Sequence, residues 1–160
     1  MPTAIALCKF VGTISLGLLT GVSYTLSTQS LPSLLTLPSA KPAAYTLAQT
    51  ARLASLHIRT LSTISTSALL LSFYLSPSRV RHPYLIWTSL AAVLAGGLDL
   101  GFSGRGVQPK GRVVKDEVGD VNGEEVERGA REQQFIELVR MTLSGVGFTM
   151  GVVGIWGEGA

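Results

Sequence analysis

Few side chains in this sequence are equipped for chemistry. The 160 residues include two histidines, His57 and His82, and one cysteine, Cys8. A metal site needs several converging ligands, and neither histidine has a second ligand at helical spacing. No phosphate-binding loop or dinucleotide fingerprint occurs, and no clustered basic face with interleaved aromatics indicates nucleic-acid binding. We therefore predict a non-enzymatic chain with no metal, no cofactor, no small-molecule substrate and no nucleic-acid partner.

One carboxylate, Asp99, lies in or near an otherwise uncharged segment. Carboxylates within membranes are functional candidates by default. Because Asp99 lies near the end of its segment, we expect it at the level of the lipid headgroups, paired with Arg105. The alternative is a small four-span membrane enzyme resembling the anthrone-oxygenase-like proteins. That alternative would need further polar residues converging on Asp99.

The distribution of charge indicates the elements that position these residues. Charged residues make up 14% of the chain, against about 25% in soluble proteins, and they gather between four apolar segments. Those segments cover residues 5–27, 60–76, 84–100 and 141–157. The first has the length for a hydrocarbon core of about 30 Å, and the other three are at the short limit for spanning helices. We predict an all-α polytopic membrane protein, a four-helix transmembrane bundle forming a single domain over residues 1–160.

Two of these segments have rival interpretations. Residues 5–27 could be a signal peptide, with Gly21-Val22-Ser23 as a cleavage site. Residues 60–76 are rich in serine and threonine and could instead be a buried helix of a soluble domain. Hydroxyl groups can bond to the carbonyl one turn back or to a neighbouring helix, which makes them tolerable inside a membrane bundle.

The two long connections carry most of the positive charge. Residues 28–60 are broken by prolines as far as Pro42, after which a helix can run into the second span, with Arg52 and Arg59 on one face where they can reach lipid phosphates. Residues 101–140 form a charged, glycine-rich, flexible connection, with a short helix expected from Glu124. Because lysine and arginine favour the cytosolic side, both connections are predicted to face the cytosol.

Glycines recur one turn apart in three of the predicted spans. Such pairs open a groove in which a second backbone can approach closely. We expect these glycines to face other helices: Gly17, Gly21, Gly97, Gly101, Gly147 and Gly151.

The segment from Phe135 to Leu138 has the pattern of a peptide that docks on ubiquitin-like autophagy proteins: an aromatic residue, two intervening residues and an aliphatic residue. Docking of that kind adds a strand to a sheet edge and needs an extended peptide. Here the segment lies where a helix is expected, so helix packing is the alternative assignment for Phe135 and Leu138.

Three short pieces of the chain resemble the fungal autophagy-related protein 33 family. One is Arg81-His82-Pro83-Tyr84 at the start of a span, the second is Gly157-Glu158-Gly159 near the end of the chain, and the third is the first span. The resemblance implies a multi-pass protein of the mitochondrial outer membrane that promotes selective autophagy of mitochondria through unidentified proteins of the autophagy machinery. It brings no catalytic residues. A membrane scaffold unrelated to autophagy is the remaining alternative.

The charged connection departs from what a phosphorylation-regulated receptor would need. Ser103 is the only hydroxyl side chain between Gly101 and Arg140. We therefore do not expect this connection to be controlled by phosphorylation.

Overall fold

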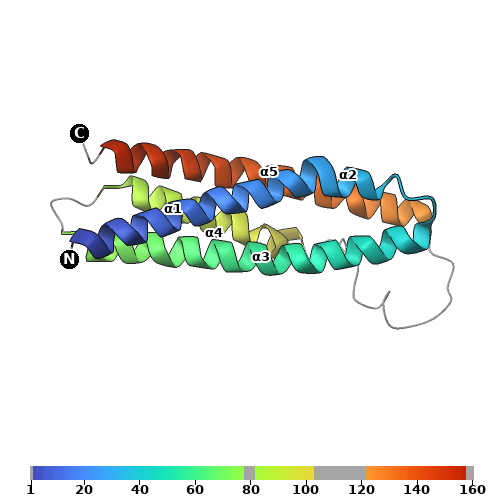
Figure 1. Ribbon diagram of the computed structural model, residues 1–160, viewed down its shortest axis with the longest axis horizontal. Helices are drawn as coiled ribbons and strands as arrows, with labels where there is room; N and C mark the ends of the chain where they lie inside the picture. Colours follow the sequence, from blue (N-terminus) through green and yellow to red (C-terminus); the bar gives the residue numbers. More distant parts are fainter. Residues whose placement is uncertain (1, 78–81, 103–121, 158–160) are drawn as a thin grey trace.

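The computed structural model describes residues 2–77, 82–102 and 122–157, and every regular element among them is a helix. The all-α prediction is confirmed for these residues. In chain order the elements are α1 (Pro2–Thr25), η1 (Leu26–Ser30), α2 (Leu31–Leu34), α3 (Ala40–Leu75), α4 (Tyr84–Phe102) and α5 (Gly123–Gly157) (Figure 1).

The first three elements form one continuous rod, because a single wide turn, η1, joins α1 to α2. In that turn the backbone amide of Leu31 donates to the carbonyl of Leu26, five residues earlier. Pro32 explains the wider spacing: it has no N–H to donate, and its ring would clash with the carbonyl four residues earlier in a regular α-helix. The rod therefore continues past residue 27, where the first span was expected to end.

Prolines mark both ends of α3. Ser39 is extended (φ −147°, ψ 151°) and precedes the helix, whose first turn contains Pro42, where a proline removes no intrahelical hydrogen bond. Ser76, just before Pro77, is also extended (ψ 130°), because a residue that precedes proline is disfavoured in the α conformation. Between these breaks α3 runs for 36 residues, about 54 Å at 1.5 Å per residue.

Capping and ion pairs start α5 well before the predicted fourth span. The side-chain oxygen of Asn122 accepts a hydrogen bond from the backbone amide of Glu124 at 3.1 Å, and acids in the first turn favour the helix dipole. One turn further on, Glu127 pairs with Arg131 at 2.7 Å. The connection predicted as residues 101–140 is thus helical from Gly123 onward, while residues 103–121 lie outside the described part.

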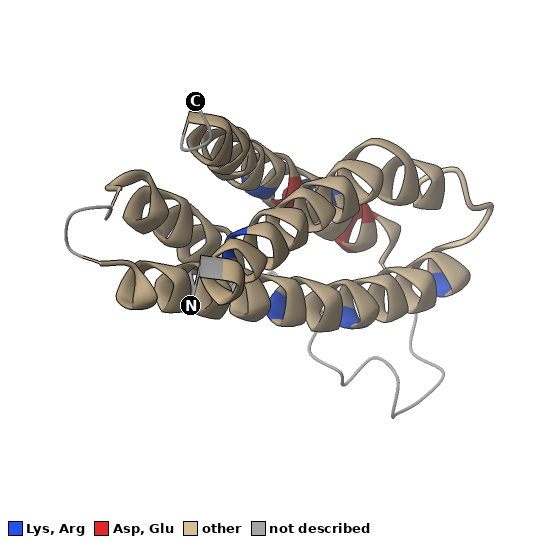
Figure 2. Ribbon diagram, turned by 60° about the vertical axis from the view of Figure 1, so that its left-hand side comes forward, with Lys and Arg blue, Asp and Glu red and all other residues tan. Residues whose placement is uncertain are grey.

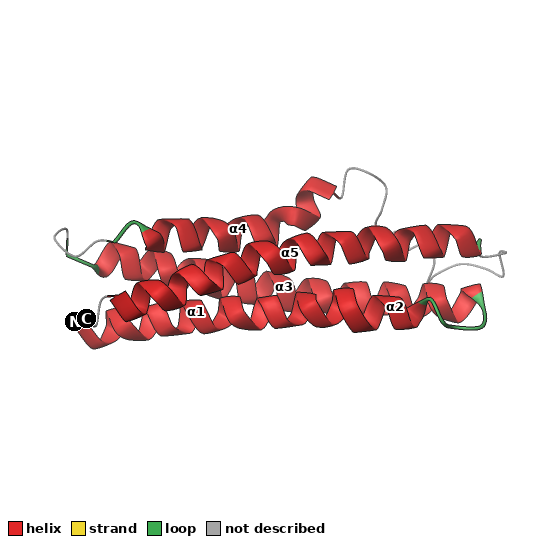
Figure 3. Ribbon diagram, turned by 90° about the horizontal axis from the view of Figure 1, so that it is seen from above, coloured by secondary structure: helices red, strands yellow, loops and turns green. Residues whose placement is uncertain are grey.

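The long helices are arranged as a ring. The rod's α1 packs against α3 and α5, and α4 packs against the same two helices, so α1 and α4 are diagonal. Because α4 is much shorter than its neighbours, it accompanies them along only one half of the molecule (Figure 3). We call this half, which also holds both chain termini, the four-helix segment. The other half, made of α2 with η1 and the first halves of α3 and α5, is the three-helix segment.

Each segment has its own apolar cluster. In the three-helix segment, Leu31, Leu34, Leu47 and Ala130 come together from α2, α3 and α5. Where the four-helix segment begins, a second cluster joins α1, η1, α3 and α4; its buried members are Leu19, Leu26, Ala54, Ile58 and Ala95.

The four-helix segment has an apolar exterior around an interior in which hydroxyl groups lie beside buried leucines such as Leu16, Leu69 and Leu85. Its interior contains many buried hydroxyl side chains, among them Thr13, Ser15, Ser23, Ser62, Ser65, Ser72, Thr88, Ser89 and Ser144. Its exterior displays large apolar side chains, among them Leu7, Phe10, Ile14, Leu18, Leu71, Tyr74, Trp87, Leu90, Val146, Val153 and Trp156. Figure 2 shows Lys and Arg at intervals along α3, and the described glutamates lie on α5. An apolar exterior around a hydroxyl-rich interior suits a lipid environment.

Candidate functional site

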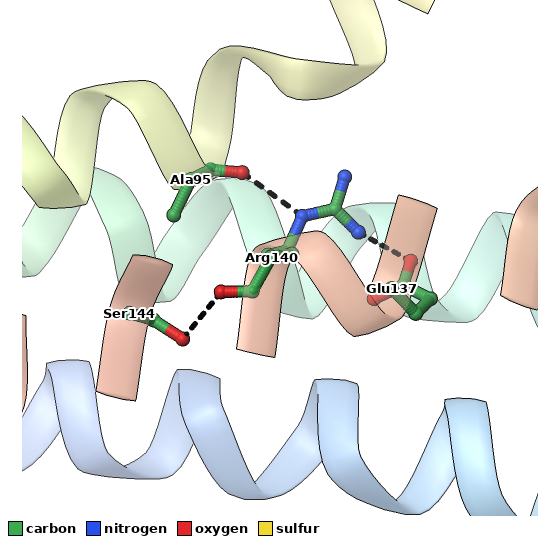
Figure 4. A network of polar contacts seen from close by, with 4 residues as sticks. All are labelled: Ala95, Glu137, Arg140 and Ser144. Atoms are coloured by element: carbon green, nitrogen blue, oxygen red, sulfur yellow. Dashed lines mark hydrogen bonds and ion pairs between the residues drawn. The ribbon is translucent and has the colours of Figure 1, made fainter. Parts of the chain in front are cut away.

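A buried ion pair lies at the point where α4 and α5 cross. Glu137 and Arg140 lie three residues apart on α5, and their side chains are 3% and 0% exposed. The guanidinium of Arg140 forms a hydrogen-bonded ion pair with Glu137 Oε1, and Arg140 Nε donates to the carbonyl of Ala95 on α4 at 2.9 Å (Figure 4). Arg140 thus binds a carboxylate on its own helix, α5, and a backbone carbonyl on α4.

Hydroxyl groups extend this polar network to α1. The hydroxyl of Ser144 donates to the Arg140 carbonyl at 2.8 Å, and Thr20 Oγ1 on α1 lies 3.0 Å from Ser144 Oγ. Three of the four helices of the ring therefore contribute polar groups to one buried cluster. We call it the Arg140 cluster: Thr20, Ala95, Glu137, Arg140 and Ser144.

The Arg140 cluster is built to hold helices together. Breaking a buried pair by removing one partner leaves an uncompensated charge, which costs about 3–5 kcal/mol. Glu137 Oε2 makes no hydrogen bond in the described part of the chain, so the carboxylate depends on Arg140 for its stabilisation. Within residues 2–77, 82–102 and 122–157, no three metal-ligating side chains come together. The geometry of the cluster is that of a structural contact that joins α1, α4 and α5.

Sequence reasoning missed this cluster. It assigned Glu137 and Arg140 to the exposed connection before the fourth span, because the uncharged stretch begins only at Met141. The available signal was their spacing: an acid and a base three residues apart lie on the same helix face. Asp99, the acid that was singled out, lies on α4, and its side chain falls outside the described part.

Three of the expected glycines lie where a side chain would collide with another helix. A β-carbon at Gly17 would lie 2.9 Å from the Phe148 ring, one at Gly147 would lie 2.7 Å from Leu16, and one at Gly151 would lie 2.9 Å from Thr13 Oγ1. All three contacts join α1 to α5. These glycines allow the close approach of the two helices.

Two other expected glycines are open. A β-carbon at Gly21 or Gly97 would meet nothing within 4 Å. Gly21 is exposed on α1, one turn beyond Gly17, so the pair does not form one continuous contact. Gly101 lies on α4, and its surroundings fall outside the described part.

Further close approaches involve residues that the spacing argument did not select. Ser65 on α3 donates to the carbonyl of Gly12 on α1 at 2.9 Å, and a β-carbon at Gly96 on α4 would lie 2.7 Å from Ser62 Cβ. The signal was a row of small residues along α3 at helical spacing, the same row that made residues 60–76 look weakly apolar: Ser62, Ser65, Ser72 and Ser76.

The first family motif contacts α5 one turn before Gly157, at the end of the bundle. Tyr84 opens α4, and its ring lies where a side chain on Gly154 would have to go, so α4 and α5 are in close contact there. His82 is next to it, with its ring centroid 6.1 Å from that of Tyr84, and the carbonyl of Pro83 accepts hydrogen bonds from the first turn of α4. Gly157 ends α5 and is exposed. Arg81, Glu158 and Gly159 lie outside the described part.

The possible docking segment is helical in the structure. Phe135 and Leu138 lie on α5 and are 61% and 48% exposed. Their side chains project outward from the bundle, with no extended backbone between them that could add a strand to a sheet.

These features define a class of protein: a helical bundle able to associate with membranes, whose buried polar groups join helices. Two of its helical stretches, Thr3–Leu34 and Gly123–Gly157, are long and apolar enough to cross a membrane, and Tyr84–Leu98 is a shorter apolar helix.

The chain belongs to the autophagy-related protein 33 family. The family model for autophagy-related protein 33 matches residues 1–134. A curated Autophagy-related protein 33 from Gibberella zeae is 34% identical over 185 residues, which cover 99% of this chain and 93% of that relative. The resemblance seen in the sequence is therefore confirmed, and the chain is a non-enzymatic autophagy-related factor. No solved structure matches it significantly.

Proposed function

We propose that this chain is a four-span protein of the mitochondrial outer membrane that promotes selective autophagy of mitochondria, acting through helix packing in the membrane and through contacts on its cytosolic side. Membership of the autophagy-related protein 33 family supports the assignment to autophagy. The apolar exterior and hydroxyl-rich interior of the four-helix segment support the membrane bundle, and this is the observation that carries the structural part of the proposal.

One stripe along α5 supports a full crossing. Phe135, Leu138, Val146, Val153 and Trp156 are exposed at helical spacing. From Phe135 to Trp156 the helix rises twenty-one residues, about 32 Å, against a hydrocarbon core of about 30 Å. Aromatic rings favour both membrane interfaces. Phe135 and Leu138 are exposed on a helix. Their exposure thus supports a role at the lipid boundary in preference to a role in docking a partner.

The length of α4 supports the placement of the membrane. With 19 residues, or about 28 Å, α4 has the length of one crossing, whereas α3 and α5 are nearly twice as long. Aligning α4 with the hydrocarbon core leaves the three-helix segment outside it. The lysine and arginine residues of the two long connections favour the cytosol for that segment.

This arrangement leaves two cytosolic elements for protein contacts: the three-helix segment and the charged connection over residues 103–121. With no catalytic group assigned to the chain, its action is contact with proteins of the autophagy machinery. The four-helix segment would hold the chain in the membrane, with the Arg140 cluster fixing how α1, α4 and α5 meet.

Loss of the protein should impair the degradation of mitochondria while bulk autophagy continues. The measurement is turnover of a mitochondrial matrix reporter in a deletion strain, compared with turnover of a cytosolic reporter. Normal turnover of mitochondria would favour a membrane scaffold without a role in autophagy.

A variant lacking residues 106–120 keeps Asn122 and all helices, and so separates the charged connection from the bundle. Full restoration of mitochondrial turnover by this variant in the deletion strain would assign the activity to the helices.

Topology has its own test. Protease added to intact mitochondria should cut within residues 103–121 and leave the two termini protected. Cleavage near the termini with protection of residues 103–121 would invert the proposed orientation.

A further inference from the structure

The outward face of α3 carries three cations that no acid in the described part of the chain neutralises. Lys41, Arg52 and Arg59 are exposed, and the 36 residues of α3 include no aspartate or glutamate. None of the three cations forms an ion pair within the described part of the chain, where the ion pairs lie on α5. A helix with unpaired cations on one face is a surface for anions.

Contacts with α4 fix the depth of two of these cations. Ser62 packs against Gly96, and Ile58 packs in the same cluster as Ala95. The two helices run antiparallel, so α4 reaches its end at Phe102, about 9 Å beyond Gly96 and level with Leu56 of α3. Because the end of α4 marks the edge of the hydrocarbon core, Arg59 lies just inside that edge and Arg52 just outside it.

We propose that Arg52 and Arg59 bind the phosphate group of an anionic phospholipid in the cytosolic leaflet. The inference rests on the proposed membrane bundle. The two residues are seven apart, two helical turns, and so lie on one face about 10 Å from each other along the helix. Long arginine side chains place the charged end at the headgroups while their stems lie along apolar surface. A guanidinium binds phosphate through two parallel hydrogen bonds.

The surface between the two arginines suits the rest of a lipid molecule. Leu53 and Leu56 are 56% and 54% exposed, and further into the four-helix segment the same helix displays Leu71 and Tyr74. An acyl chain can follow this apolar surface from the headgroup into the membrane. Between Arg59 and Leu71 the exposed Thr60, Thr63 and Ser67 donate their hydroxyls to carbonyls of the same helix. A cationic pair beside such a surface favours a lipid over a protein ligand.

The first step of the test is insertion. The full chain is reconstituted into vesicles of phosphatidylcholine with or without phosphatidylinositol, and resistance to carbonate extraction is measured. Failure to insert in either vesicle would contradict the proposed membrane bundle. Insertion followed by equal binding of both lipids would contradict only the lipid site.

The second step measures binding of phosphatidylinositol and phosphatidylcholine to the full chain in detergent by native mass spectrometry. The double variant Arg52→Gln/Arg59→Gln should lose about 25-fold in affinity for phosphatidylinositol, because each basic residue at an anionic surface contributes about fivefold. Binding of phosphatidylcholine should not change. The matched control Arg128→Gln/Arg131→Gln removes two exposed cations from α5 and should change affinity for either lipid less than about twofold, since those arginines are already paired with glutamates.

Three outcomes would overturn the assignment: equal affinity of the first double variant and the unchanged chain, an equal loss in the control, or a change in oligomer size without a change in lipid binding. The last would assign the face to a second copy of the chain, whose exposed Glu124 and Glu125 would supply the negative charge. Circular dichroism of both variants checks that helix content is retained, as expected for exposed side chains.

Discussion

The four-helix and three-helix segments share α3, α5 and the rod that begins with α1, yet they differ in which side chains are buried: the four-helix segment buries many hydroxyl groups, and the three-helix segment buries mainly leucine and alanine. Along α3, Leu47 is buried and Lys41 is exposed in the three-helix segment, whereas Ser65 is buried and Leu71 is exposed in the four-helix segment. The change occurs within one unbroken helix. This difference is what the proposed membrane arrangement predicts, with lipid around the four-helix segment and water around the three-helix segment.

The same comparison separates the forces that hold each half together. In water, burial of Leu31, Leu34 and Leu47 is favoured by about 25 cal/mol per Å² of apolar surface. Lipid is as apolar as leucine and gives no such driving force, so helices within it are held by close packing and interhelical hydrogen bonds. In the proposed membrane arrangement, Gly147 and the Arg140 cluster supply these two contributions in the four-helix segment. Substitutions in the two segments should thus act through different mechanisms.

The largest effect should come from breaking the buried ion pair. Arg140→Met leaves the Glu137 carboxylate alone inside the bundle and should lower the free energy of unfolding by about 3–5 kcal/mol. This loss of stability is measured by thermal unfolding in detergent and by the steady-state amount of protein. Arg131→Met, which removes an exposed partner on the same helix, is the control. The double variant Arg140→Met/Glu137→Leu should recover most of the loss; without recovery, the charge is not the cause.

The next effect tests the environment of each segment directly. Val146 and Tyr45 are equally exposed, at 56% and 55%, but Val146 lies midway along the proposed crossing of α5. Val146→Lys should cost about 2.5–3.5 kcal/mol at the centre of a membrane, while Tyr45→Lys should stay within about 0.5 kcal/mol. Insertion efficiency and protein abundance report the difference. Equal tolerance of both lysines would mean that water surrounds both segments.

Overpacking between α1 and α5 should have an intermediate effect. Gly147→Leu forces atoms against Leu16 and Ala91, which lie 2.7 and 2.9 Å from the β-carbon position, and should destabilise by about 1–3 kcal/mol. Gly21→Leu is the matched control, because nothing lies within 4 Å of that position. The melting temperatures of the two variants are compared with that of the unchanged chain. A similar decrease in both variants would indicate a general effect of replacing glycine.

The smallest effect should come from the exposed ion pair of the three-helix segment. Glu127→Gln removes the partner of Arg131, whose side chain is 69% exposed. Such pairs on a helix surface are worth about 0.3–0.5 kcal/mol and are screened by salt. Unfolding measured at low and high salt should show this small difference only at low salt. A loss comparable to that of Arg140→Met would contradict the distinction between the two segments.

Much of this protein could be determined from its sequence. The breaks at Pro38 and Pro77 and the cap at Asn122 are local signals, because each depends on backbone chemistry within a few residues. The uncharged stretches indicated apolar helices, and the short motifs around Tyr84 and Gly157 indicated the family.

Only the tertiary structure decided which residues form the contacts. Gly17 and Gly21 have identical spacing to Gly147 and Gly151, yet Gly21 is open and the other three meet a neighbouring helix. Arg140, at the edge of a charged stretch, is the largest fully buried side chain in the described part of the chain. The physical reason is that spacing along one helix defines a face, whereas the partner of that face depends on helices that are distant in the sequence.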